Sequence, residues 1–322
     1  MNDRFATTVA RPRMLIMSNA IEAMVKPSPE EFDIVRLDDG GADRDAFLRE
    51  VGAGLEVVLC SGGERLDAAR LDLLPDLKLI AVVAAGMAGI DLDHAARRGI
   101  AVTNAGGLNS GDVAEFAVTM MLAHRRDIVA ADRWVRDDEW VERRMPVGRS
   151  VSGERVGVVG LGHIGDGIAR RIAPFVSEVR WWGPRAKPEI PWAREGSILD
   201  LARWSTTLFI AARGDDSSRG LVTAEIIDAL GPEGLIVNVA RGFVIDEPAM
   251  IAALKTGRLG GAALDVFEEE PARAADWADV PNLLMAPHVA GATREAFARV
   301  FANALDNIRR HFAGQPLVNR VI

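Results

Sequence analysis

The feature that most constrains the fold of this chain is a glycine-rich turn that follows a short apolar run. Gly160, Gly162 and Gly165 stand at the spacing G-x-G-x-x-G after residues 156–159, and a helical pattern begins at once. Gly160 permits a sharp turn, Gly162 lets the backbone approach a pyrophosphate, and Gly165 lets the helix pack on its strand. Unpaired N–H groups and the helix dipole favour an anion there. The sequence therefore predicts an α/β fold with a dinucleotide site.

Composition excludes several classes of function. The chain has 322 residues, of which 49% are hydrophobic, so it is long enough to bury the cores of two domains. Its net charge of −8 argues against a nucleic-acid partner, because phosphate binding needs a concentrated basic surface. No apolar run reaches the length of about 18 residues that a membrane span requires. We therefore expect a globular protein that binds a small molecule, without a bound metal ion.

The single cysteine and the first residues of the chain indicate the cellular compartment in which the protein is found. Cys60 has no partner for an internal disulfide and ends an apolar run, so we expect a small buried residue rather than a nucleophile. Residues 1–12 lack the continuous apolar core of a secretory signal and contain Asp3, and we interpret them as a frayed leader. Both observations favour the cytoplasm.

Strand and helix patterns alternate along the whole chain, which indicates two doubly wound, Rossmann-like domains with parallel sheets. A long helical pattern at residues 112–136 is expected to cross from the first domain to the second, and a last helix at 294–312 is expected to return to the first. The substrate domain would therefore be discontinuous and flavodoxin-like, with residues 1–103 and 292–322, and residues 104–291 would form the dinucleotide-binding domain. The expected strands are 14–17, 33–36, 57–59, 79–83, 101–103, 155–159, 179–182, 207–211, 235–238, 261–265 and 283–286.

Three further segments carry reactive side chains just beyond expected strands, namely residues 237–242, 264–271 and 286–293. In an open α/β sheet, ligands bind outside the carboxyl ends of the strands. The segments contribute a cation, carboxylates and a histidine. Hydride transfer to a 2-keto acid needs a cation for the substrate carboxylate and a proton donor for the carbonyl oxygen, so this set of groups fits that reaction.

With these motifs the sequence resembles the D-isomer-specific 2-hydroxyacid dehydrogenases. The matching segments run in the family's order: Asn104-Ala105-Gly106-Gly107-Leu108-Asn109, the glycine loop, Asn-x-x-Arg-Gly at 238–242, Asp-Val-Phe-x-x-Glu-Pro at 265–271, and Pro-His-x-x-Gly-x-Thr at 287–293. The stretch 225–232 and an arginine-bearing turn after residue 182 most resemble the branch of glyoxylate/hydroxypyruvate and hydroxyphenylpyruvate reductases.

The resemblance implies a role for each matching residue. Arg241 would bind the substrate, His288 would deliver or accept the proton, and Glu270 would orient His288. The main-chain N–H groups of Ala85, Gly86 and Met87 resemble a carboxylate-binding loop, and Asp265 resembles the acceptor for the nicotinamide amide. The other residues expected at the cofactor are Gly160, Gly162, His163 at the rim, Ile164, Gly165, Gly183, Arg185, Ala212, Ala240, His288 and Gly291.

The end of the second strand of the dinucleotide domain departs from an NAD-binding pattern. An acidic residue about 20 positions beyond the glycine loop would bind the ribose 2′-hydroxyl, but this chain has Gly183 there, followed by Arg185 and Lys187. Glu178 lies at the wrong end of that strand. Because an arginine accommodates the 2′-phosphate, we expect NADP(H) to be favoured over NAD(H), although Arg185 could also be an ordinary exposed charge.

The sequence leaves open the roles of Arg213, Trp140 and Met145 and the direction of the reaction. Arg213 either reaches a phosphate or pairs with Asp215 or Asp216. Trp140 and Met145 either cover a substrate of the partner subunit or pack in the homodimer that the resemblance implies. The function we expect is reduction of glyoxylate, hydroxypyruvate or an aryl pyruvate to the D-2-hydroxy acid. It competes with NAD-dependent oxidation, as in a phosphoglycerate dehydrogenase, and with a dinucleotide-sensing scaffold like the dehydrogenase-related corepressors.

Overall fold

A computed structural model describes residues 11–322 and divides the chain into two compact units. Unit 1 holds the residues up to 109 together with 294–322, and unit 2 holds 110–293. The sequence led us to expect the divisions after 103 and 291. The interpretation of residues 1–12 as a leader falls almost entirely outside the described residues. Within the described part, no helix has the length and apolar character needed to cross a membrane.

Unit 1 is built on a five-stranded sheet in the order β2-β1-β3-β4-β5. Every pair of neighbouring strands is parallel. This strand order is that of flavodoxin-like folds. The strands are β1 (Arg13–Ile16), β2 (Asp33–Arg36), β3 (Leu55–Cys60), β4 (Leu79–Val82) and β5 (Ala101–Thr103).

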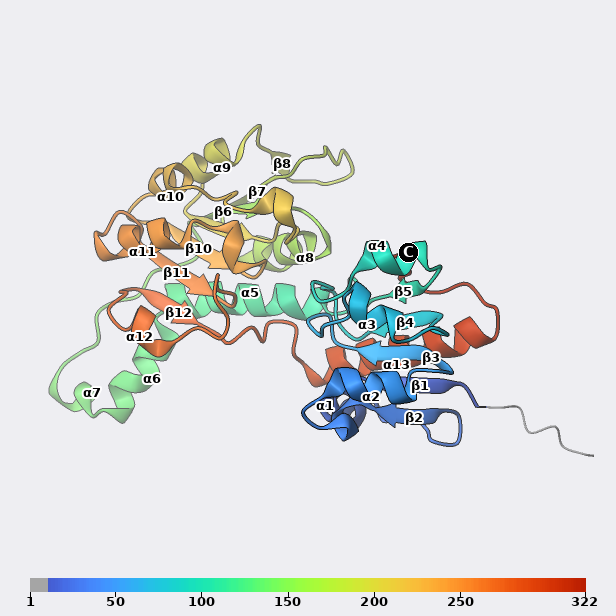
Figure 1. Cartoon of the computed structure of the whole chain (residues 1–322). Helices are drawn as coiled ribbons and strands as arrows, with labels where there is room; N and C mark the ends of the chain where they lie inside the picture. The colour runs from blue at the N-terminus through green and yellow to red at the C-terminus, as the bar shows by residue number, and fades with distance from the viewer. Residues whose placement is uncertain (1–10) are drawn as a thin grey trace, which may run out of the picture. The chain divides into compact units, whose positions relative to one another are not determined.

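Helices cover both faces of this sheet because its strands are apolar on both sides. One core contains buried residues of α2 (Arg44–Val51), α3 (Ala68–Asp72) and α4 (Leu92–Arg97). The other contains residues of α1 (Asn19–Val25) and α13 (Arg294–Phe312). Figure 1 shows α13, in red, beside the blue strands of the N-terminal half. The last helix therefore returns to the first unit, as its apolar face predicted.

Unit 2 contains a seven-stranded sheet in the order β12-β11-β10-β9-β6-β7-β8, again parallel throughout. The order reverses beside β6, which is the strand that leads into the glycine loop. The two-residue edge strand β8 was not predicted. The strands are β6 (Arg155–Val159), β7 (Glu178–Trp182), β8 (Ala193–Arg194), β9 (Thr207–Ile210), β10 (Leu235–Asn238), β11 (Gly261–Leu264) and β12 (Leu283–Met285).

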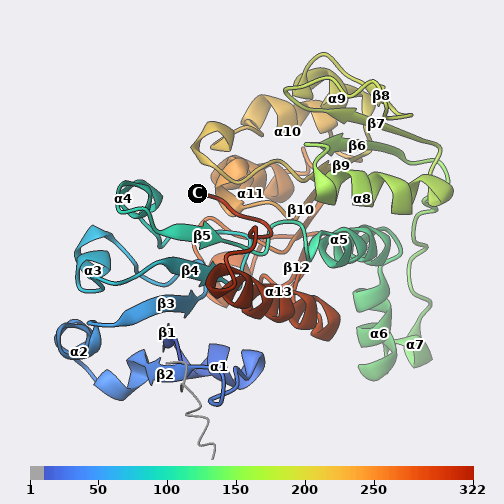
Figure 2. The same cartoon turned by 90° about the vertical axis from the view of Figure 1, so that its right-hand side faces the viewer.

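The second sheet is also covered on both faces. On one side α5 (Ser110–Arg125) and α8 (His163–Ile172) lie side by side, as Figure 2 shows, and pack on the sheet. On the other side are α9 (Ile198–Trp204), α10 (Ala224–Leu230) and α11 (Glu247–Lys255). A short helix, α12 (Ala274–Trp277), adds the buried ring of Trp277 to this core. The prediction of two doubly wound α/β domains with parallel sheets is confirmed.

The expected single helix at 112–136 is wrong in one respect, because the structure breaks it. Helix α5 ends at Arg125, Asp127 adopts a left-handed backbone with φ of +51°, and α6 (Ile128–Arg136) begins anew. The apolar periodicity continues across the break, but α6 buries none of its residues. With α7 (Glu139–Glu142) it stands away from the sheet of unit 2 (Figure 1).

Candidate active site

The glycine loop follows β6 and is held tightly by its neighbours. The N–H of Gly160 donates to the carbonyl oxygen of Trp182 at 2.8 Å, and its φ of +89° suits glycine. A Cβ on Gly160 would lie 2.6 Å from Cα of Ala212, and one on Gly165 would lie 2.0 Å from the carbonyl oxygen of Gly160. Both positions therefore need glycine for close packing.

The N-terminus of α8 is shaped to receive an anion. Gly162 is its N-cap residue and supplies no side-chain hydrogen bond, so the first N–H groups of the helix lack a side-chain acceptor. A Cβ on Gly162 would meet nothing within 4 Å, which leaves room in front of the helix. His163 is exposed at this end and Ile164 is partly buried. These residues fit the pyrophosphate of a dinucleotide.

The strand beside the loop, β7, ends without an acidic residue. Gly183 is buried against the ring of Trp181, where its missing Cβ would lie 3.2 Å from the nearest ring carbon. Arg185 is exposed, and Nζ of Lys187 donates to the carbonyl oxygen of Leu161 at 2.5 Å. Leu161 belongs to the glycine loop, so Lys187 lies directly at the expected phosphate site.

A histidine that contacts a glutamate follows β12. Nδ1 of His288 lies 2.7 Å from Oε2 of Glu270, and Oε1 of Glu270 accepts the N–H of Phe267 at 3.1 Å. The carboxylate is thus fixed by the backbone and in turn fixes the imidazole. Both side chains are partly exposed, at 46% for His288 and 36% for Glu270. Because Nδ1 is engaged, Nε2 is the nitrogen available to a substrate.

Asp265 stabilises the turn that carries His288. It is buried, and its two carboxylate oxygens accept the N–H groups of Val289 at 2.8 Å and Ala290 at 2.9 Å. Burial raises the pKa of its carboxyl group. His288 itself has a φ of +54°, a region that residues with side chains seldom adopt. A contact of Asp265 with the nicotinamide amide stays a prediction. It would use the lone pairs of the carboxylate oxygens that do not accept these backbone hydrogen bonds.

Arg241 lies beyond β10 in a turn stabilised by Asn238. Oδ1 of Asn238 accepts the N–H of Ala240 at 3.0 Å, and its Nδ2 donates to the carbonyl oxygen of Arg241 at 3.1 Å. Nη1 of Arg241 donates to the carbonyl oxygen of Ala240 at 2.6 Å. No carboxylate of the described residues pairs with this guanidinium. It is therefore a cation available to an anionic substrate.

Gly214 is a residue whose role sequence reasoning missed. A Cβ at this position would lie 2.4 Å from Cγ of Arg241, so the alkyl stem of the arginine packs on the bare backbone of Gly214. The sequence signal was present as an unusual segment at 212–215, but the contact joins residues 27 positions apart and is tertiary. Arg213, whose role the sequence left open, pairs with Asp215: its Nε lies 3.2 Å from Oδ2 of that residue, and its side chain is 91% exposed.

The strand order places these groups in a row along one edge of the sheet in unit 2. Because all strands are parallel, the loops after them share the carboxyl edge. From β12 to β7 the row reads His288, then Asp265 with Glu270, Arg241 with Ala240, Ala212 with Gly214, the glycine loop, and Gly183. Gly291 follows His288 in the first loop of the row. The ionic groups thus occupy one end of the edge, and the glycine loop and the strand without an acid occupy the other.

The residues expected to bind a carboxylate lie in unit 1, at the carboxyl end of β4. The carbonyl oxygen of Ala85 accepts Nδ2 of Asn104 at 2.9 Å, and that of Met87 accepts the N–H of Ile90 at 3.1 Å. Gly62 packs against Gly86 so closely that a Cβ on it would lie 1.7 Å from the Gly86 carbonyl oxygen. These contacts hold the backbone of the loop in place, and binding of a carboxylate by its N–H groups stays a prediction.

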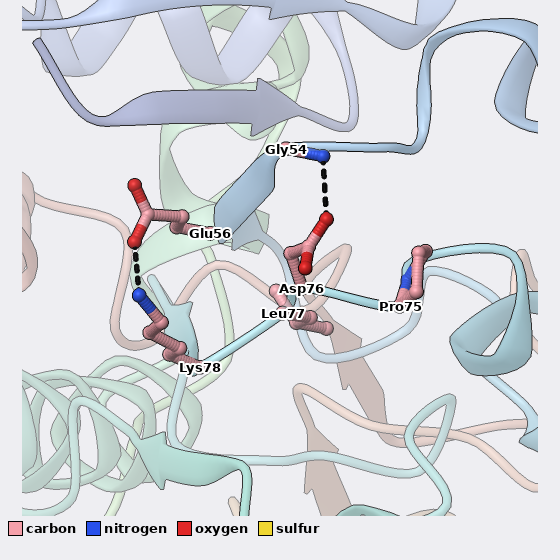
Figure 3. A pocket seen from close by; sticks show the side chains of 6 residues that line it. All are labelled: Gly54, Glu56, Pro75, Asp76, Leu77 and Lys78. Carbon is pink, nitrogen blue, oxygen red and sulfur yellow. Dashed lines mark hydrogen bonds and ion pairs between the residues drawn. The ribbon is translucent and has the colours of Figure 1, made fainter. Parts of the chain in front are cut away.

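A hollow on the opposite edge of this sheet contains none of the predicted site residues. It is lined by Gly54, Glu56, Pro75, Asp76, Leu77 and Lys78, at the amino ends of β3 and β4. Figure 3 shows that its charged groups are satisfied locally, since Glu56 pairs with Lys78 and Asp76 accepts the N–H of Gly54.

Cys60 is buried, as expected. Burial raises the pKa of its thiol well above the usual range, which does not suit a nucleophile.

Comparison with known proteins places this geometry in a family. The family model described as "D-isomer specific 2-hydroxyacid dehydrogenase, NAD binding domain" matches residues 118–290. The 2-ketogluconate reductase of Gluconobacter oxydans is 36% identical over 275 residues, which cover 85% of this chain and 89% of that protein.

Two solved structures share the fold over both units. A 2-hydroxyacid dehydrogenase from Ketogulonicigenium vulgare is 37% identical, with a TM-score of 0.92 over 97% of this chain and 99% of that one. An NADPH-dependent glyoxylate/hydroxypyruvate reductase from Sinorhizobium meliloti, solved with NADP and malonate, is 30% identical, with a TM-score of 0.85 over 97% of each chain. The chain belongs to the D-isomer specific 2-hydroxyacid dehydrogenases, enzymes that interconvert 2-keto acids and D-2-hydroxy acids with a nicotinamide dinucleotide.

Proposed function

We propose that this enzyme works as an NADPH-dependent reductase of a 2-keto acid, with Arg241 and His288 as its catalytic residues and with Glu270 positioning His288. The observation that carries the proposal is the row of groups along the carboxyl edge of unit 2. At one end of the row are a histidine in contact with Glu270 and an arginine that has no carboxylate partner among the described residues. At the other end is a cofactor turn that contains cations and no acidic residue. The bound dinucleotide would supply the hydride.

Substrate binding rests on the guanidinium group of Arg241. A planar guanidinium donates paired hydrogen bonds to a carboxylate and its neighbouring carbonyl oxygen. The N–H groups of Ala85, Gly86 and Met87 stay predicted contacts of a substrate carboxylate. Because Arg241 has no carboxylate partner among the described residues, binding a keto acid does not require it to break an ion pair.

Proton transfer rests on His288. With Nδ1 fixed by Glu270 at 2.7 Å, the imidazolium presents Nε2–H to the keto oxygen. As the carbonyl carbon accepts the hydride, His288 gives this proton to the oxygen and the D-2-hydroxy acid forms. Glu270 stabilises the charged ring before the transfer, which makes it a positioning residue.

Cofactor preference rests on the turn after β7. An acid at Gly183 would repel a 2′-phosphate, whereas Arg185 and Lys187 would attract it. The NADP-bound relative from Sinorhizobium meliloti supports the same preference. We therefore assign NADP(H) as the favoured cofactor, and His163, Ile164, Ala212, Ala240, Asp265 and Gly291 as further residues that face it.

The first experiment follows absorbance at 340 nm with NADPH and with NADH. The substrates are glyoxylate, hydroxypyruvate, phenylpyruvate, hydroxyphenylpyruvate and, because of the Gluconobacter relative, 2-ketogluconate. Faster oxidation of NADPH with one of them supports the proposal. A higher kcat/KM with NADH would remove the cofactor preference, and tight dinucleotide binding without turnover of any keto acid would favour the sensing scaffold.

We also propose a homodimer that acts in the cytoplasm and has no nucleic-acid partner. The arm formed by α6, α7 and the following loop exposes apolar side chains: 55% of Val135, 68% of Trp140, 80% of Val141 and 97% of Val147 are accessible. Such a surface is typical of a protein interface. The net charge of −8 supports the absence of nucleic acid. Light scattering after gel filtration tests the oligomer, and a monomer at micromolar concentration would contradict it.

A further inference from the structure

The carbonyl group of Gly183, the residue just after β7, is held by an arginine from the neighbouring edge strand. Nε and Nη2 of Arg194 donate to the carbonyl oxygen of Gly183 at 3.2 and 2.7 Å. Arg194 lies on β8, in register with Trp181 of β7, and its guanidinium carbon is 5.8 Å from the centroid of the Trp181 ring. The guanidinium thus sits over the point where the cofactor turn begins.

This guanidinium is fixed in place but its charge is not neutralised. The adjacent carboxylate, Glu195, pairs instead with Nη1 of Arg180 at 2.8 Å. Within the described part of the chain, Arg194 takes part in no ion pair. Its Nη1 amino group is not used by the Gly183 carbonyl and remains a donor. An arginine oriented beforehand by a carbonyl and a ring loses little further freedom when it binds an anion.

The position of Arg194 matches the part of a dinucleotide that distinguishes its two forms. Gly183 stands where an acid would bind the ribose 2′-hydroxyl, and an added Cβ there would lie 4.0 Å from the N atom of Leu161. Lys187 contacts the same loop residue, because its Nζ donates to the Leu161 carbonyl oxygen. One anchored cation, Arg194, therefore contacts Gly183, and a second, Lys187, contacts the loop residue next to it. The exposed Arg185 lies two residues beyond Gly183.

We propose that Arg194 is a specificity residue for the 2′-phosphate of NADP(H), acting as the fixed cation of a site that Arg185 and Lys187 complete. This inference rests on the proposed preference for NADP(H). The inference about Arg194 goes beyond that preference because Arg194 does not belong to the turn after β7. It lies on the edge strand β8, which sheet pairing brings next to that turn.

The experiment measures binding of adenosine 2′,5′-bisphosphate and of 5′-AMP by calorimetry. These ligands differ only in the 2′-phosphate, so no turnover is involved. Arg194→Gln keeps a donor for the Gly183 carbonyl but removes the charge. Because a charge-assisted hydrogen bond is lost, the Kd of the bisphosphate should rise about 10- to 100-fold while the Kd of 5′-AMP stays within about twofold.

Two further variants make the result specific. Arg203→Gln is the matched control, since Arg203 is an exposed arginine near the C-terminal end of α9, and it should change neither Kd. Arg194→Lys keeps a charge without the planar fork and should weaken bisphosphate binding less than Arg194→Gln does. If Arg194→Gln does not fold, Arg194→Lys alone tests the proposal. Bisphosphate binding by Arg194→Lys as tight as that of the wild type would then contradict a role for the fixed planar guanidinium group.

The possible failures can be told apart. If the wild type binds the bisphosphate no better than 5′-AMP, both the proposed NADP(H) preference and the role of Arg194 are wrong. If the wild type prefers the bisphosphate and Arg194→Gln keeps that preference, the cofactor proposal stands and the inference about Arg194 falls. Equal weakening of both ligands would assign Arg194 to strand support alone.

Discussion

Nδ1 of His288 lies 2.7 Å from Oε2 of Glu270, although the two residues belong to loops that follow different strands. The pairing of β11 with β12 brings these loops together. Glu270 is held by the N–H of Phe267, and the turn of His288 is held by Asp265, so both partners are fixed independently. In an imidazole restrained in this way, Nδ1 contacts the glutamate and Nε2 is available to exchange a proton with a substrate.

The first prediction concerns this pair. His288→Ala should lower kcat by about 10²- to 10⁴-fold, because general acid catalysis contributes that much, while the Kd of NADPH changes little. Glu270→Gln should lower kcat less, by about 10- to 100-fold, because the ring loses its charged partner but keeps a polar neighbour. In the double variant the effects should not add, since both residues act through one proton transfer. Normal turnover by His288→Ala would remove it as the acid.

The second prediction concerns Gly214. Gly214→Ala would put a Cβ 2.4 Å from Cγ of Arg241, near the base of the side chain, where rotation of the guanidinium cannot relieve the clash. The arginine should shift, and the KM for the keto acid should rise about tenfold, consistent with loss of one charge-assisted contact. Gly153→Ala is the matched control, because a Cβ there meets nothing within 4 Å. Steady-state kinetics that are equal in the two variants would contradict the packing argument.

The third prediction concerns Arg185. Arg185→Ala should raise the KM for NADPH about tenfold and leave the KM for NADH nearly unchanged, because only the former carries the 2′-phosphate. The measurement is the ratio of kcat/KM values for the two cofactors at constant ionic strength, since salt screens an exposed cation. An equal effect on both cofactors would dismiss a role of Arg185 at the 2′-phosphate.

The fourth prediction concerns His124 and stability. Burial lowers the pKa of His124; its Nε2 donates to the carbonyl oxygen of Asn282 at 2.9 Å, and its buried Nδ1 has no partner among the described residues. The folded state thus prefers the neutral ring. Its contribution is fully present above the unfolded pKa of about 6.5 and is lost as the pH falls from there towards the lower folded value, by at most about 1.4 kcal/mol per pH unit.

The test is urea unfolding of the wild type and of His124→Gln between pH 7.5 and about 5. The glutamine can keep a donor for Asn282 but does not titrate. The free energy of unfolding should fall more steeply with decreasing pH in the wild type than in the variant. Parallel curves would show that His124 does not contribute to the acid sensitivity of the fold.

Much of the fold could be predicted because its signals are local. The strands of both sheets are short apolar runs bounded by turns, and the expected bounds differ from the observed ones by a residue or two. The elements that the sequence did not predict, such as β8 and α9, are short, or their apolar residues show no clear period. The break at Asp127 escaped detection because it depends on the backbone of one residue, while the apolar pattern continues on both sides of it.

By itself, the sequence determined the α/β class and the glycine turn at 160–165, because spacing along the chain encodes both. The candidate set Arg241, Glu270 and His288 came from the motifs that resemble the D-2-hydroxyacid dehydrogenases. Only the tertiary structure decided that Glu270 contacts His288, that Gly214 supports Arg241 and that Arg194 reaches Gly183. Those contacts join different strands or loops. Sheet pairing and side-chain packing create them, and neither leaves a periodic signal in the sequence from which the contact could be deduced.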